Sequence, residues 1–106
     1  SHLNALVRVK LTLTEDHPTV RPYEQALWAE QPDVLGVPVE ASLAILSGLH
    51  ERWGHLWRSM DDETFARTAH HPEWGDVTLE FFLQQYAWHG DHHVTQIEQL
   101  RARKGW

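Results

Sequence analysis

From residue 78 to residue 104, apolar side chains recur every three or four residues, and this spacing constrains the fold more than any other feature of the sequence. An α-helix turns once in 3.6 residues, so these side chains form one stripe along a helix. Thr78 is a good first cap for such a helix, and Gly105 is a good stop. The sequence therefore predicts a long helix over 78–104 that buries one face.

Two earlier segments repeat the spacing and predict helices over 1–14 and 39–60. A short turn capped by Asp61 or Asp62 follows, and residues 70–77 are typical of a loop with a short hairpin. We therefore predict an all-α fold in one domain, residues 1–106. The predicted core consists of the apolar residues on the inner helix faces: Leu43, Leu46, Leu49, Trp53, Leu79, Phe82, Tyr86, Ile97 and Leu100.

The stripe of the last helix is interrupted where its rhythm reaches His89 and His93. Residues four apart project from one helix face, about 6 Å apart along the axis, so both imidazoles can reach one ion at ~2.0–2.1 Å. His2 lies on the apolar stripe of the first helix, and a suitable packing angle brings it opposite this pair. Three imidazoles with an open position are typical of a catalytic metal site. Two core histidines without metal explain the spacing equally well.

The remaining histidines are less distinctive. His92 points to a neighbouring helix face, and it is a weak candidate for a catalytic role together with Asp91 and Glu51. His50 and His55 are five residues apart, which separates them around the helix axis, so surface or packing positions are expected. We expect the loop histidines to be solvated: His17, His70 and His71.

Composition excludes several classes of function. Nine basic residues against fifteen acidic ones give a net charge of −6. The basic residues form no concentrated patch, so nucleic-acid binding is not expected. No apolar run is long enough to span a membrane, and no basic-then-apolar leader opens the sequence, so we expect a cytoplasmic protein. Cysteine is absent, so any thiol chemistry requires a thiol from outside.

The segments SHLNALVRVKLTLTED, RPYEQALWAE, HPEWG, YAWHGDHH and RKGW resemble the YfiT-like branch of the DinB superfamily. That resemblance implies a four-helix bundle with a metal ion bound by three histidines, which correspond here to His2, His89 and His93. Zinc and nickel suit such a site best, and iron, manganese or copper are alternatives. The resemblance also implies one further helix before His2.

The same resemblance implies a metal-dependent enzyme that joins a low-molecular-weight thiol, held as its thiolate, to a small electrophile. A hydrolase in which the ion activates water is the alternative. A third hypothesis, from another class, is a non-catalytic metal-binding bundle or dimerisation module.

The arrangement of helices also predicts how the core is completed. Three helices so rich in Trp and Leu leave an apolar face without a partner, and exposing a whole bundle wall costs several kcal/mol at roughly 25 cal/mol per Å². Either a helix outside this sequence or a second chain, as in a homodimer, should cover that face. The alternative is that the three helices close on themselves. The four prolines of residues 15–39 predict an extended connector with one helical turn at 23–30. This connector should lie across the metal-bearing end.

Overall fold

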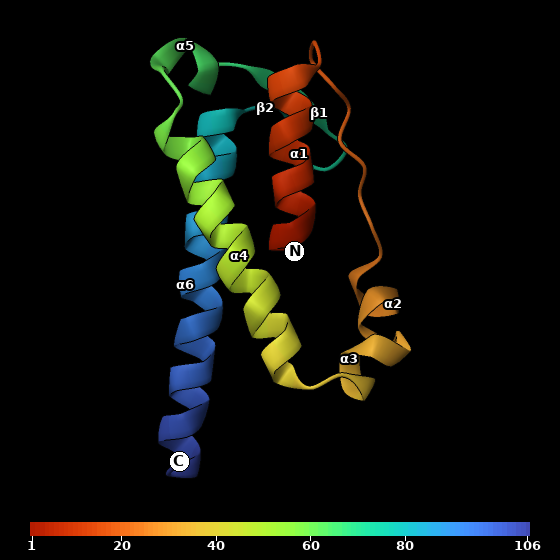
Figure 1. The fold of residues 1–106 in the computed structure, drawn as a ribbon, viewed down its shortest axis with the longest axis vertical. Helices are drawn as coiled ribbons and strands as arrows, with labels where there is room; N and C mark the ends of the chain where they lie inside the picture. The colour runs from red at the N-terminus through yellow and green to blue at the C-terminus, as the bar shows by residue number, and fades with distance from the viewer.

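A computed structural model describes residues 1–106 as three long helices joined by short elements (Figure 1). The long helices are α1 (His2–Thr14), α4 (Val39–Arg58) and α6 (Leu79–Lys104). The shorter elements are α2 (Gln25–Ala29), α3 (Pro32–Gly36), α5 (Asp62–Phe65), β1 (Thr68–His71) and β2 (Gly75–Thr78). The mostly helical prediction is confirmed, with the small β1–β2 hairpin as its only sheet.

The buried core surrounds α1. This helix packs against both α4 and α6, and it buries Ala5, Val9 and Thr12 completely. Ala5 and Val9 are small, so the neighbouring helices can approach closely. The rest of the buried apolar core comes from α4, α6, the hairpin and the connector: Val20, Leu49, Trp53, Ala69, Val77, Leu79, Phe82 and Tyr86.

The hairpin is attached to the C-terminal end of α1. Arg67 donates hydrogen bonds to the carbonyl oxygens of Thr12 at 2.9 Å and Glu15 at 3.0 Å. These carbonyls lie at the helix end where a cation is favourable. The connector joins the same region, because Val20 N–H donates to the His70 carbonyl and His70 N–H donates to the Pro18 carbonyl.

The helix ends follow the local signals in the sequence. Thr78 Oγ1 accepts from Phe81 N–H at 3.1 Å at the start of α6, and Asp61 Oδ1 accepts from Thr64 N–H at 2.8 Å at the start of α5. Gly105 ends α6 with a φ of +70°, a left-handed conformation that costs glycine little. These predicted caps are confirmed. The second short helix of the connector, α3, was not predicted.

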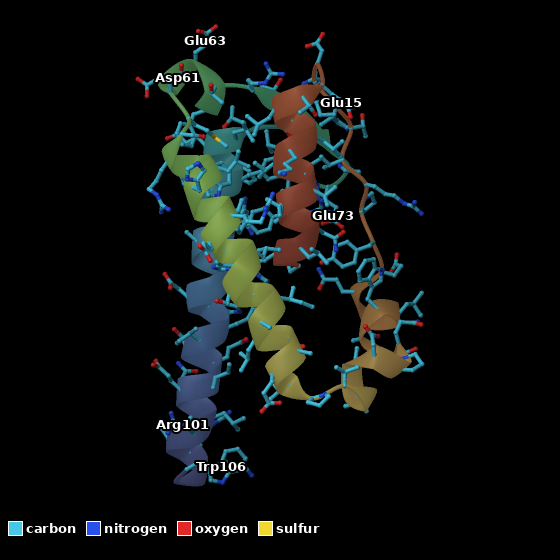
Figure 2. The ribbon with its side chains drawn as sticks, viewed as in Figure 1. Glu15, Asp61, Glu63, Glu73, Arg101 and Trp106 are labelled. Carbon is cyan, nitrogen blue, oxygen red and sulfur yellow. The ribbon has the colours of Figure 1, made fainter.

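Four predicted core positions are wrong. Leu43, Leu46, Ile97 and Leu100 are exposed, although they continue the buried faces of α4 and α6. The reason is helix length: α1 has 13 residues and α6 has 26, about 20 Å against 39 Å at 1.5 Å per residue. Figure 1 shows α4 and α6 continuing well beyond the N-terminal end of α1, and Figure 2 places Arg101 and Trp106 at that far end.

The exposed side chains of Leu43, Leu46, Ile97 and Leu100 define a distal apolar face. The sequence predicted one apolar wall without a partner, but it placed these four residues inside the core. The three helices do not close on themselves there. That a further helix or a second copy of the chain covers it stays a prediction. No single helix is both long and apolar enough to cross a membrane; only the pair Gln25–Gly36 and Val39–Arg58, bent by 117°, meets that standard together.

Stability measurements test this division between the buried core and the distal face. Phe82→Ala should lower the free energy of unfolding by about 3–5 kcal/mol, because Phe82 is fully buried. Ile97→Ala should change it by no more than about 0.5–1 kcal/mol in the isolated chain, because Ile97 is 59% exposed. Urea titration of both variants measures the difference. An equal loss in the two variants would show that a partner buries Ile97 in solution.

Candidate metal centre

Four imidazoles from the three long helices form one cluster: His2 of α1, His50 of α4, and His89 and His93 of α6. His2 Nδ1 lies 2.8 Å from His50 Nε2, and His2 Nε2 lies 3.4 Å from His89 Nδ1. His89 Nε2 lies 3.0 Å from His93 Nε2. The three histidines selected from the sequence therefore lie together, and His50, expected at a surface or packing position, joins them.

The packing of α1 determines where His2 lies. Its ring centroid is 5.3 Å from that of Trp53 and 5.8 Å from that of Tyr86, both in edge-on contact. A Cβ atom placed on Gly90 would be 3.8 Å from His2 Cε1, so the ring lies against the α6 backbone between His89 and His93. The buried Trp53 Nε1–H beside this cluster has no hydrogen-bond acceptor.

The cluster favours uncharged imidazoles. Burial, reinforced by the neighbouring His50 and His89, lowers the pKa of His2 to about 4 from an ordinary value of 6.5. Burial and then His93 also lower the pKa of His89. Protonating one ring costs electrostatic energy when a neighbouring ring is already positively charged. At neutral pH both residues therefore keep a nitrogen lone pair, which is the form that binds metal ions.

Two neighbours orient the outer rings of the cluster. Gln96 Oε1 accepts a hydrogen bond from His93 Nδ1 at 2.8 Å, which leaves Nε2 of His93 as the lone-pair nitrogen on the side of His89. His50 Nε2 pairs with His2 Nδ1, which leaves His2 Nε2 on the side of His89. A hydrogen bond to the far nitrogen is the usual way in which proteins orient a metal-binding histidine.

The residues fit a metal ion by donor type and spacing. Nitrogens that share a tetrahedral ion at ~2.0–2.1 Å lie roughly 3.3 Å apart, and the two contacts of His89 span 3.0 and 3.4 Å. However, His89 contacts His2 through Nδ1 and His93 through Nε2. The three rings therefore lie in a row and do not surround one point. The structure accordingly contains no group of three His, Asp or Glu side chains already arranged around one point. That His2, His89 and His93 bind a metal therefore stays a prediction.

The three weak catalytic candidates lie outside this cluster. The hydrogen bonds of the four imidazoles are made with one another and with Gln96, and none involves Asp91 or Glu51. Both carboxylates are exposed. His92 is also exposed, and it stacks on Trp88 with 4.7 Å between ring centroids.

Two of the three loop histidines behave as expected, and one does not. His17 and His70 are exposed and contact the Asp76 carboxylate at 3.3 and 2.9 Å. His71 is only 4% exposed, so its predicted solvated position is wrong. The error arose because residues 70–77 form a hairpin whose inner face packs on the core, and His71 belongs to that face.

A cavity of about 170 Å³ adjoins the imidazole cluster at His89. Its walls include Pro22, Tyr23 and Gln25 of the connector, together with residues of α1, the hairpin and α6. The connector therefore does border the candidate site, as predicted, through residues 22–25. Val20 of the connector belongs to the buried core, whereas α2 and α3 contribute no buried residue.

Comparison with known proteins identifies the family. The family model of the DinB superfamily matches residues 1–97. The chain belongs to the DinB superfamily. This membership agrees with the helical fold and with the resemblance seen in the sequence.

Relatives and a solved structure extend this comparison. Two Bacillus cereus proteins, provisionally named metal-dependent hydrolases, are each 45% identical over 106 residues, which is 100% of this chain and 61% of each relative. YfiT from Bacillus subtilis, provisionally described as a metal-dependent hydrolase with an unusual four-helix bundle topology, superposes with a TM-score of 0.93 at 42% identity. That match covers 99% of this chain and 61% of YfiT. The chain thus spans about three fifths of these DinB proteins.

The depressed pKa values predict that the metal-free protein loses stability in mild acid. Unfolded His2 binds a proton below pH 6.5, whereas folded His2 stays neutral to about pH 4. The unfolded state therefore binds more protons in this window, and stability falls as pH decreases from 6.5 to 4. Urea titrations of chelator-treated protein should show this slope, and His2→Gln should flatten it. A slope of unchanged steepness in His2→Gln would assign the effect to other groups.

Proposed function

We propose that this chain carries the metal-binding part of a metal-dependent enzyme and that the imidazole cluster holds one divalent ion through His2, His89 and His93. The observation that supports this most is the shared orientation of His2 Nε2 and His93 Nε2 toward His89. The provisional names of the Bacillus relatives support metal dependence as well. When bound, a divalent ion lowers the pKa of a coordinated thiol or water, which supplies a nucleophile at neutral pH.

We infer that the nucleophile is a small thiol and that the reaction transfers it to a small electrophile. The imidazole cluster has no carboxylate in contact with it that would act as a general base. A thiol needs less help than water, because its ordinary pKa is about 8.5 rather than 15.7. In the transfer, sulfur forms a bond to carbon, the leaving group departs with its electron pair, and the thiol proton passes to solvent.

Hydrolysis is the second candidate, and the relatives' names favour it. The same three histidines would hold the ion, and water would replace the thiol. His50 would orient His2 in either reaction, because His50 Nε2 lies 2.8 Å from His2 Nδ1. A third candidate function is a metal-binding bundle without catalytic activity.

Metal content tests the proposed ligands. His2→Ala, His89→Ala and His93→Ala should each weaken zinc or nickel binding by more than about 100-fold, since even loss of a hydrogen bond to a ligand costs 10–100-fold. His50→Ala should fall within that smaller range. His92→Ala is the matched control and should bind normally, because His92 is exposed and makes no hydrogen bond to the four imidazoles. Titration calorimetry measures each affinity, and equal binding by all five variants would exclude the site.

Substrate assays separate the two reactions. Zinc-loaded protein should accelerate the loss of free thiol when it is mixed with a thiol and chlorodinitrobenzene, and a chelator should abolish the acceleration. His93→Ala should lose at least 90% of the rate, whereas His92→Ala should retain it. Acceleration of p-nitrophenyl acetate hydrolysis alone would favour the hydrolase, and acceleration of neither reaction would favour the non-catalytic bundle.

A further inference from the structure

The cavity beside His89 is lined by side chains that have unused hydrogen-bond donors. We call it the Arg8 pocket, after the α1 residue that donates a hydrogen bond to the connector. Its walls include Arg8, Tyr23, His71, Trp74, Tyr86 and His89. At about 170 Å³ it is smaller than the ~300–1,000 Å³ typical of drug-sized ligands, so it suits a small molecule or one end of a larger one.

His71 lines this pocket and has one ring nitrogen without a hydrogen bond. It is 4% exposed, and its Nδ1 accepts hydrogen bonds from Glu73 N–H at 3.1 Å and Trp74 N–H at 3.3 Å. The proton must therefore sit on Nε2, which has no hydrogen-bond partner within the protein. Burial and then the charge of Arg8 lower the pKa of His71, so the ring is a neutral donor at neutral pH. Stacking on Trp74, with 4.0 Å between centroids, holds it in place.

Arg8 and Tyr86 provide the other two donors. One Arg8 nitrogen donates to Tyr86 Oη at 3.2 Å, and the other donates to the Arg21 carbonyl at 2.8 Å. These bonds fix the guanidinium against α6 and the connector, while its remaining N–H groups are free. Tyr86 is buried, and its hydroxyl oxygen accepts a hydrogen bond from Arg8. The hydroxyl proton itself has no acceptor within the protein. A permanent positive charge thus stands beside two neutral donors.

One acidic side chain also borders the pocket. Glu73 is exposed and follows His71 in the tight turn of the hairpin, and Figure 2 shows it beside the N-terminal half of α1. Its charge opposes an anion at the rim, but water screens it there more than the part-buried Arg8. Inside the pocket, the donors outnumber this single carboxylate.

We propose that the Arg8 pocket binds the carboxylate of a small substrate, with Arg8, Tyr86 and His71 as its hydrogen-bond donors. A guanidinium is suited to a carboxylate, because its planar fork matches the two oxygens. Because His89 belongs both to this pocket and to the imidazole cluster, a molecule held here places its other end at the candidate metal centre. Only this last point rests on the proposed function; binding of the carboxylate does not.

Binding to metal-free protein tests the proposal with two matched compounds, 3-mercaptopropionate and its methyl ester. The acid should bind at least tenfold more tightly than the ester, since a hydrogen bond to a charged group is worth about 1.5–3 kcal/mol and 1.4 kcal/mol is tenfold. The indole N–H signal of Trp74 in NMR spectra reports occupancy of this pocket. Equal affinity for acid and ester would overturn the proposal.

Variants assign the effect to these residues. Arg8→Gln should remove most of the preference for the acid, Arg8→Lys should retain part of it, and Tyr86→Phe should reduce it about three- to tenfold. Glu73→Gln should strengthen binding of the acid, because it removes the opposing charge. Arg52→Gln is the control for loss of one positive charge, since Arg52 is exposed on α4 and lines a different cavity. If Arg52→Gln lowers the preference for the acid as much as Arg8→Gln does, the attraction is not local and the proposal fails.

A further variant keeps this proposal separate from the proposed function. His93→Ala removes a candidate metal ligand that does not line the Arg8 pocket. It should bind 3-mercaptopropionate as the unmodified protein does. In the unmodified protein, a preference for the acid with no metal-dependent activity would refute the proposed function alone. Activity on thiols with no preference for the acid over the ester would refute the carboxylate site alone.

Discussion

The position of α1 determines the rest of the structure. Its buried face, Ala5, Val9 and Thr12, packs against α4 and α6, and Ala5 and Val9 belong to the single buried core cluster. The same packing places His2 over α6 and Arg8 beside the hairpin. Because His2 and Arg8 are six residues apart, they project from different sides of one helix. One helix therefore contributes both to the imidazole cluster and to the Arg8 pocket.

The candidate site gathers polar groups where the core would otherwise be apolar. Placing imidazoles against Trp53 and Tyr86 disfavours their charged forms, and the lowered pKa of His2 expresses that cost. Such an arrangement lowers the stability of the metal-free protein in acid, and it keeps lone pairs available for an ion at neutral pH. Gln96 and His50 then hold the rings so that these lone pairs point toward His89.

The two parts of the site have complementary chemistry. The imidazole cluster offers uncharged nitrogen lone pairs, whereas the Arg8 pocket offers hydrogen-bond donors and a fixed positive charge. His89 lies between them and belongs to both. If both proposals hold, a charged group would be bound beside the candidate metal centre without a second charge entering the imidazole cluster.

Local sequence signals are enough to predict the ends and faces of the helices. Thr78, Asp61 and Gly105 act within a turn of their own position, and the four-residue spacing of His89 and His93 holds in any helix. The apolar stripe of the first helix singled out His2, and the DinB resemblance implied the same residue. Which faces are covered depends on how the helices pack, because the short α1 leaves Ile97 and Leu100 exposed. Packing also brings His50 into the imidazole cluster and His71 to the Arg8 pocket. Helical and strand periodicity indicate which side a residue faces but not which distant segment packs there.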